Sequence, residues 1–337
     1  METSTLFLSP ETARVALDNG HVLAERRDGA PPIRVRIEDL ARVVVVGRPP
    51  VSVPVLLSLL DKGVPSFFVS SRGRWRGSLS PDDNRNAARR IRQYERASDS
   101  EFELAVARAL VAAKLRNECA VLRRLGSNRP LLRLRAFRPA RKEIERAVPA
   151  LDRLADLDTL RGAEGAAAVR HFEALGSAFP ATMPFAGRNR RPPKNAANAL
   201  LSFSYALLLG EVECTVRAHG LDPGIGHLHR DRTRSASLAL DLMEPFRPAM
   251  DRFAVKLASL GMLDATKHFE RRDDGGTYFN AAGRAILLPA WEEEMRHGFA
   301  RPCDGANTTL RKEIDADVCS YLRFLEDDAP SSFFALP

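Results

Sequence analysis

Hydrophobic and polar residues alternate through much of the region between residues 5 and 80, the period of strands with one buried face. Two alternating stretches flank Asp18-Asn19-Gly20, and Asn-Gly favours a tight hairpin because both residues tolerate positive φ angles. The apolar run at residues 43–46 indicates a strand buried on both faces. The other elements expected here are strands in TLFLS, RVRIEDLARVVVVG, SFFVSS and RWRGSLS, and one short helix in PVSVPVLLSLLDKGVP.

After PDDNRNAARR the hydrophobic period changes from that of strands to that of helices. The pattern predicts one long helix in EFELAVARALVAAKLRNECAVLRRL, and a loosely held tail in DDAPSSFFALP. Further helices are expected around 137–160, 162–178, 195–219, 233–260 and 280–300. The prediction is therefore an α+β fold, with a small N-terminal β-rich domain (residues 1–85) followed by a larger all-α domain (residues 86–337).

The net charge of the chain indicates what kind of partner it could bind. The chain has 51 Lys and Arg against 43 Asp and Glu, a net charge of +8, which favours a polyanion such as nucleic acid. A GC-rich genome favours arginine codons and so explains why arginine replaces lysine, but it does not explain why basic residues outnumber acidic ones. The absence of a long apolar run and of a basic leader leads us to expect a cytoplasmic protein with no membrane partner. The cysteines are scattered without a CxxC pair, so neither a zinc site nor a disulfide framework is expected.

Three segments of the helical half carry candidate chemistry. In RGAEGAAAVRHF, Glu164 lies among glycines and alanines at a predicted helix start. The small neighbours leave room for a ligand to approach the carboxylate, but a glutamate in the first turn of a helix is also commonly just solvated. GLDPGIGHLHR is an irregular turn that delivers His227 and His229 two residues apart, pointing the same way if the stretch is extended. In SLALDLMEPFRP, Asp241 and Glu244 share a face of a predicted helix, as metal ligands or as exposed acids paired with arginines.

Together these carboxylates and imidazoles supply oxygen and nitrogen donors, which suit Mg²⁺ or Mn²⁺ at a phosphodiester. Such an ion polarises a phosphoryl oxygen, neutralises charge in the transition state, and activates a water molecule or a 3′-hydroxyl group.

The order of four motifs resembles that of a known family. The motifs are GxEGxAA…HF, NALLSFSYALL, GLDPxIGxLH and SLALDLMEPFRP, and the first half of the chain matches more loosely through RVVVVG and GVPSFFVS. They resemble the CRISPR-associated adaptation integrase and endonuclease family, the catalytic spacer-acquisition proteins, over almost the whole chain. The resemblance implies a metal-dependent DNA integrase and endonuclease that inserts short foreign DNA fragments into a CRISPR repeat array by 3′-hydroxyl attack on a phosphodiester.

The same resemblance implies roles for individual residues. Glu164, His229 and Glu244 match the family's metal ligands, and Asp241 matches the neighbouring acid that supports catalysis by binding a second ion or by orienting a ligand. Among the departures from the pattern, His227 stands where an apolar or aromatic residue is common. This leaves open whether His227 joins the metal or lines the DNA, and we favour the DNA.

The expected partners also follow from the resemblance: a homodimer formed through the β domains, a small ferredoxin-like CRISPR adaptation partner protein, and double-stranded DNA from the incoming fragment and the repeat array. The residues themselves offer candidate phosphate contacts in the basic loop RNRRPPK and just after His229, although a solvated basic loop is an equally simple account. These candidates are Arg188, Arg190, Arg191, Lys194 and Arg230.

Two other functions remain as alternatives. One is a stand-alone repair nuclease that acts on branched DNA, which the sequence does not separate from an integrase because one centre serves both reactions. The other is a DNA-binding scaffold with a relict site. All four acidic and imidazole positions are filled, which argues against a relict.

Overall fold

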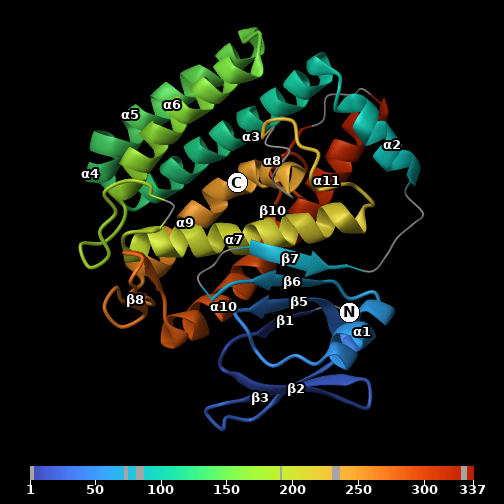
Figure 1. The fold of residues 1–337 in the computed structure, drawn as a ribbon. Helices are drawn as coiled ribbons and strands as arrows, with labels where there is room; N and C mark the ends of the chain where they lie inside the picture. Colours follow the sequence, from blue (N-terminus) through green and yellow to red (C-terminus); the bar gives the residue numbers. More distant parts are fainter. Residues whose placement is uncertain (1–3, 72–74, 81–86, 190–191, 230–235, 328–331) are drawn as a thin grey trace.

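The computed structural model describes residues 4–71, 75–80, 87–189, 192–229, 236–327 and 332–337 (Figure 1). N-terminal strands are followed by a mostly helical region, so the predicted fold class is confirmed. The first part contains β1 (Ser4–Leu8), β2 (Thr12–Asp18), β3 (His21–Arg26), β4 (Ile33–Arg36), β5 (Leu40–Val46), α1 (Val53–Asp61), β6 (Ser66–Val69) and β7 (Trp75–Leu79).

These strands form two sheets. One has the order β1-β5-β6-β7, in which β1, β5 and β6 run parallel and β7 antiparallel, and the other is the antiparallel sheet β2-β3-β4. The hairpin between β2 and β3 is confirmed, with positive φ angles at Asn19 and Gly20. The single strand expected in RVRIEDLARVVVVG is wrong: a 3-10 turn at Ile37–Asp39 divides it into β4 and β5, which belong to different sheets.

Strand β5 is shared by two hydrophobic cores, as the apolar run at 43–46 predicts. Val43 and Val45 face a smaller core formed with β2, β3 and α1, whereas Val44 and Val46 face the larger core of the helical half. There the sheet packs on α7 (Ala196–Ala218), and the contact is close because α7 carries a glycine. A Cβ atom at Gly210 would lie only 2.5 Å from the Phe67 ring.

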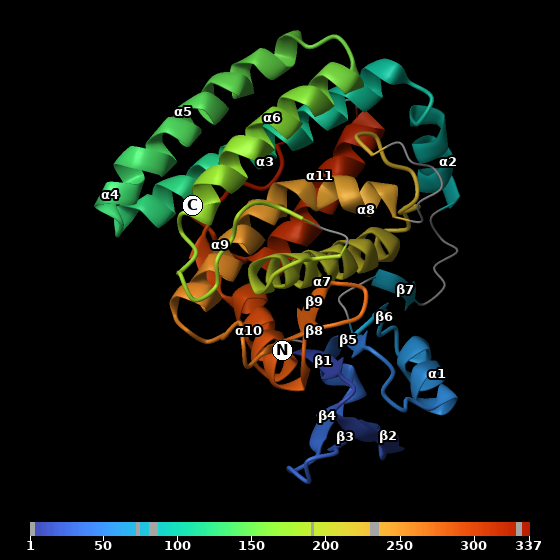
Figure 2. The same ribbon diagram turned by 60° about the vertical axis from the view of Figure 1, so that its left-hand side comes forward.

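In the helical half, α7 lies between the N-terminal sheet and most of the other helices (Figures 1 and 2). The other elements described there are α2 (Ala87–Arg96), α3 (Ser100–Ser127), α4 (Pro130–Leu132), the π-helical turn η3 (Arg133–Phe137), α5 (Arg138–Ala147), η4 (Val148–Arg153), α6 (Leu157–Gly176), α8 (Ser237–Leu242), η5 (Glu244–Phe246), α9 (Arg247–Ser259), β8 (Phe269–Arg271), β9 (Thr277–Phe279), α10 (Ala281–Arg296), β10 (Gly298–Ala300), β11 (Asn307–Thr309) and α11 (Leu310–Asp327).

Helix α7 is long and apolar enough to cross a membrane by length and composition, but 83% of its most apolar 18-residue window is buried inside the protein. It is the central core helix, in line with its apolar residues lying on all sides. The predicted all-α second part is interrupted by two short hairpins, β8–β9 and β10–β11. The sequence-based prediction also missed α11, which packs against α7 and α10.

The predicted loose tail is wrong for the residues that are described. Phe333, Phe334 and Leu336 are buried, and the Phe334 ring stacks on Phe246 with 4.4 Å between centroids. The amide of Asn117 in α3 holds this segment: its nitrogen donates to the Phe334 carbonyl at 2.9 Å, and its oxygen accepts from the Leu336 amide at 2.8 Å.

Replacing Asn117 with alanine is expected to destabilise the protein by about 3 kcal/mol. The side chain makes three buried hydrogen bonds, the third donated to the Pro245 carbonyl at 2.8 Å, and each is worth about 1 kcal/mol. Urea unfolding of both proteins measures the loss. Asn128→Ala, at an exposed helix end on α3, is the control, and a loss at Asn117 no larger than at Asn128 would contradict this anchoring role.

Candidate functional site

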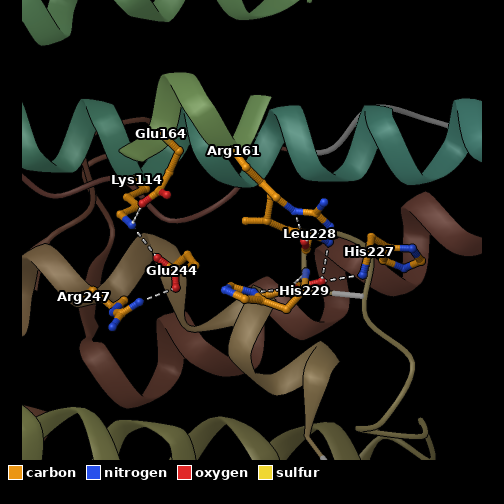
Figure 3. Close-up of polar contacts among 9 residues, drawn as sticks. Lys114, Arg161, Glu164, His227, Leu228, His229, Glu244 and Arg247 are labelled. Atoms are coloured by element: carbon orange, nitrogen blue, oxygen red, sulfur yellow. Dashed lines mark hydrogen bonds and ion pairs between the residues drawn. The ribbon is translucent and has the colours of Figure 1, made fainter. Parts of the chain in front are cut away.

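Glu164 lies in the middle of α6 and not at a helix start, where the sequence-based prediction placed it. Helix α6 begins at Leu157 because the Asp156 carboxylate caps it, accepting from the Asp158 and Thr159 amides at 2.9 and 2.8 Å. The Glu164 side chain therefore projects from the third turn toward α3 (Figure 3). Gly162 and Gly165 have open space where a Cβ would stand, so these positions leave the surroundings of the carboxylate accessible.

His229 is held by Asp241. The ring Nδ1 and the backbone amide of His229 both lie within hydrogen-bonding distance of Asp241 Oδ1, at 2.7 and 2.9 Å. The other oxygen, Oδ2, accepts from the His227 and Leu228 amides at 2.5 and 2.9 Å. With Nδ1 donating to Asp241, Nε2 of His229 has no hydrogen-bond partner among the described residues and offers its lone pair to an ion, and the ring is turned toward Glu244 (Figure 3).

The Asp241 carboxylate is fully buried and engaged by four donors, so it orients His229 and is not arranged to bind a second ion. The turn reaches it because Gly226 has no side chain: a Cβ there would lie 2.9 Å from Asp241 Oδ2 and 2.7 Å from the Ser237 carbonyl carbon. Burial alone would lower the pKa of His229, but the hydrogen bond and charge of Asp241 outweigh it and raise this pKa.

Asp241 and Glu244 do not share a helix face, contrary to the sequence-based prediction. Helix α8 ends at Leu242, and Glu244 opens the 3-10 turn η5, which continues into α9. The two carboxylates consequently have different partners. Asp241 accepts from the backbone of the turn at 227–229, whereas Glu244 is directed toward Lys114 of α3 (Figure 3).

The structure adds a residue that the sequence-based prediction missed, Lys114 of α3. Its buried ammonium group donates to both Glu164 and Glu244, the latter at 2.7 Å, and Arg247 Nη1 donates to the second oxygen of Glu244 at 2.5 Å. A single lysine within the apolar stretch AVARALVAAKL was the available signal.

The charges of this cluster are strongly coupled. Burial alone would raise the pKa of Glu244, but Arg247, Lys114 and His229 outweigh it and hold this pKa well below its usual range. Burial alone would lower the pKa of Lys114, whereas Glu244 and Glu164 raise it. Both groups are therefore ionised at neutral pH, and the cluster already holds a positive charge between its carboxylates.

The other histidine of the turn, His227, does not belong to the site. His227 is fully buried, its Nε2 lies 2.8 Å from the Tyr321 hydroxyl, and its ring packs edge-on against Phe102. Burial lowers the pKa of His227, so it is neutral. The favoured interpretation that His227 lines DNA is wrong because the side chain points into the core.

The candidate phosphate contacts are only partly described. Arg188 is committed to α7, donating to Asn198 and Ser202 at 3.0 Å each, with its guanidinium over the Tyr205 ring. Lys194 is exposed at the edge of the same loop. Arg190, Arg191 and Arg230 lie outside the described residues.

A chain of buried polar groups lies behind the cluster. His171 Nε2 is 2.9 Å from Asp251 Oδ2, and the Tyr205 hydroxyl donates to the other oxygen of Asp251. Glu118 of α3 is also buried there, with charge coupling to His171 and Lys114, and burial raises the pKa of Glu118 to about 7.

Glu118→Gln is expected to make the protein more stable than the wild type at pH 8 by about 2–3 kcal/mol, and to lose this advantage near pH 5. The folded-state pKa of Glu118 is raised from 4.5 to about 7, so its proton is held more tightly in the folded state. Its stabilising contribution is complete below the unfolded-state pKa and is lost as the pH rises through about 7. Urea unfolding at both pH values tests this, with the exposed Glu101→Gln of α3 as the control. An equal effect at both pH values would contradict the assignment.

A further group of ligand-type side chains lies away from this cluster, at the junction of α7 and α11. His219 Nε2 is 2.8 Å from Asp315 Oδ1 and 4.0 Å from Cys319 Sγ. Burial raises the pKa of Cys319, which keeps the thiol protonated, and His219 is paired with Asp315. We therefore interpret this group as a hydrogen-bonded contact that links the end of α7 to α11.

Comparison with known proteins agrees with this architecture. A model of the family described as CRISPR associated protein Cas1 matches residues 6–293. The CRISPR-associated endonuclease Cas1 1 of Thermus thermophilus is 36% identical over 303 residues, which are 88% of this chain and 89% of that protein. A casposase bound to its integration product has the same fold, with a TM-score of 0.84 at 20% identity over 99% of this chain and 94% of that one.

A chain of a Cas6-RT-Cas1–Cas2 complex also shares the fold, with a TM-score of 0.80 at 19% identity over 99% of this chain and 36% of that one. The two structural neighbours support the fold, while the family model and the Thermus relative both extend over most of the chain. The protein therefore belongs to the Cas1 family of CRISPR-associated proteins, whose named members are endonucleases.

Proposed function

We propose that this chain is a metal-dependent DNA integrase and endonuclease that inserts short foreign DNA fragments into a CRISPR repeat array. The observation that carries the proposal is the convergence of Glu164 from α6 and Glu244 from η5 on one buried cation, the ammonium of Lys114, with His229 from the turn before α8 close enough to Glu244 for their charges to interact. Membership of a family of named endonucleases supports nuclease chemistry, and the likeness to a casposase with its integration product supports strand joining.

The donor set fits Mg²⁺ or Mn²⁺, because it offers two carboxylates and an imidazole nitrogen and contains no thiolate. Glu164, Glu244 and Nε2 of His229 would hold the ion, which supplies charge neutralisation and polarisation at a phosphoryl oxygen. Asp241 keeps the His229 ring in the tautomer and orientation that this requires. Lys114 and Arg247 keep Glu244 ionised and place two further positive charges beside the incoming phosphate.

In the proposed reaction the 3′-hydroxyl of the incoming fragment attacks a phosphodiester at the edge of a repeat. A new phosphorus–oxygen bond forms, and the bond between this phosphorus and the 3′-oxygen of the repeat strand breaks. The attacking hydroxyl loses its proton to solvent, and the released 3′-oxygen takes up a proton from solvent to become a hydroxyl group. Water in place of the 3′-hydroxyl gives hydrolysis, and the reverse reaction gives disintegration. The protein contributes chiefly by positioning and by charge stabilisation.

The proposed partners are double-stranded DNA, a second copy of the chain bound through the N-terminal strands, and a small ferredoxin-like adaptation protein. The fold shared with a chain of a Cas1–Cas2 complex supports the small partner. Lys194, together with Arg190, Arg191 and Arg230, is proposed to contact phosphates, and Arg188 to brace the loop. We place this activity in the cytoplasm, where the repeat array lies.

A strand-transfer assay tests the proposal. Purified protein, with and without the small partner, is mixed with a labelled short duplex and a repeat-bearing supercoiled plasmid in Mn²⁺ or in EDTA. Metal-dependent transfer of label to the repeat borders is the expected result. Cleavage of branched DNA without joining would replace the integrase by a repair nuclease. Binding without chemistry in Mn²⁺ would leave a scaffold.

A further inference from the structure

Almost all of the net positive charge of the protein lies in one short segment. Residues 123–146 contain nine basic and two acidic residues, a net charge of +7, against +8 for the whole chain. This segment, here called the basic arm, comprises the end of α3, then α4, η3 and α5. In both ribbon views α5 lies on the outside of the helical half (Figures 1 and 2). The loop at 188–194, from which DNA contacts were predicted, is outside the arm.

The charges of the arm follow one helix face. Arg135, Arg138, Lys142 and Arg146 are exposed and recur at spacings of three and four residues, whereas Ala140 and Ile144 are buried on the opposite side. At 1.5 Å per residue the four cations extend over about 16 Å. That length corresponds to about five base pairs of duplex DNA.

These four cations have no acidic partner in the part of the chain that the structure describes. The two glutamates of the arm are already occupied, Glu145 by Arg141 at 3.1 Å and Glu143 by Arg170 of α6 at 2.8 Å. Like charges spaced along one helix face oppose folding by a few tenths of a kcal/mol per pair. A polyanion that binds along this face would remove that repulsion.

We propose that the basic arm binds the phosphate backbone of duplex DNA beyond the reacting phosphodiester. The proposal rests on the proposed function only in taking DNA as the substrate. The chemistry favours a duplex: the arm presents long cationic side chains, and its aromatic ring, Phe137, is buried, so it offers no stacking platform for single-stranded bases. Helix α5 packs against α6, which carries Glu164, so DNA bound on the arm lies on an element adjacent to the catalytic cluster.

The test compares two variants of the full chain that lose the same charge. The arm variant carries Arg135→Gln, Arg138→Gln, Lys142→Gln and Arg146→Gln. The matched control removes four exposed cations elsewhere, by Arg14→Gln, Lys62→Gln, Lys267→Gln and Lys312→Gln. Fluorescence anisotropy with a labelled duplex gives the dissociation constant of each protein at a series of salt concentrations, and circular dichroism verifies that both variants fold.

The arm variant is expected to bind the duplex at least about tenfold more weakly at 100 mM salt, with a salt slope shallower by about 3–4, because about one counterion is released per phosphate contact. The control variant should stay within about twofold of the wild type. Equal losses in both variants, or none in the arm variant, would overturn the proposal. The titration uses no metal, so its result tests DNA binding by the arm even if the wild type shows no strand transfer. Strand transfer by the arm variant should recover at saturating DNA.

Discussion

Glu164→Ala is expected to reduce metal-dependent strand transfer by at least about a thousandfold, equivalent to about 4 kcal/mol of transition-state stabilisation. The substitution removes one of two carboxylates that would hold the ion, while Lys114 keeps its contact with Glu244 and the fold survives. Duplex binding should change by less than about twofold, because neither the basic arm nor the 188–194 loop is altered. The measurement is strand transfer in Mn²⁺ at saturating DNA, alongside an anisotropy titration.

Glu173→Ala is the matched control for this experiment, since Glu173 is an exposed glutamate on the same helix that pairs with Arg170. Its strand transfer should equal that of the wild type. If Glu164→Ala and Glu173→Ala were equally active, Glu164 would have no part in binding the ion, and the proposed metal centre would be wrong.

Asp241→Asn is expected to weaken the apparent affinity for Mn²⁺ by about 10–100-fold, the usual cost of losing a carboxylate that orients a histidine ligand. An amide nitrogen in place of one oxygen would face backbone N–H groups that now donate to the carboxylate, so the turn at 227–229 and the His229 ring lose their fixed orientation. Activity measured against Mn²⁺ concentration should shift to higher concentration and recover at saturation, whereas Glu164→Ala should not recover.

A metal-free readout separates this positioning role from a general structural one. The Asp241 carboxylate raises the pKa of His229, so nuclear magnetic resonance of the metal-free Asp241→Asn protein should show this pKa lowered. The exposed Asp158→Asn should leave it unchanged. An unchanged His229 pKa with unchanged Mn²⁺ dependence would mean that Asp241 does not act through His229.

The sequence predicted the order of elements well where one period persisted over many residues. The long helix at 100–127 and the hairpin at Asn19-Gly20 are examples. It failed where a boundary depends on one side chain: Asp156 caps α6, but the residues around it were predicted to be helical, which placed Glu164 at a helix start. The hairpins β8–β9 and β10–β11 have strands of three residues, too short to show an alternation. Helix α11 did have an apolar period, through Ile314, Val318 and Leu325, and was overlooked.

The candidate site was also predicted only in part. Motif order selected Glu164, His229 and Glu244, and the structure brings them to one place, although the ion itself is a proposal. Lys114 lies 50 residues from Glu164 and 130 from Glu244, and no local pattern links positions so far apart. The different roles of His227 and His229 could not be predicted either, because a spacing of two residues does not determine which ring is buried in the core.

The sharing of β5 between two cores has a consequence for how the protein unfolds. Alternate valines of a single strand are buried in opposite directions, so the smaller core cannot unfold without withdrawing Val44 and Val46 from the larger core. The two parts of the chain that look separable in sequence are thus thermodynamically linked, and a single cooperative transition follows in place of two independent ones. Removal of residues 1–80 would expose the face of α7 on which β6 and β7 pack. The strands therefore serve as one wall of the core that supports the catalytic helices.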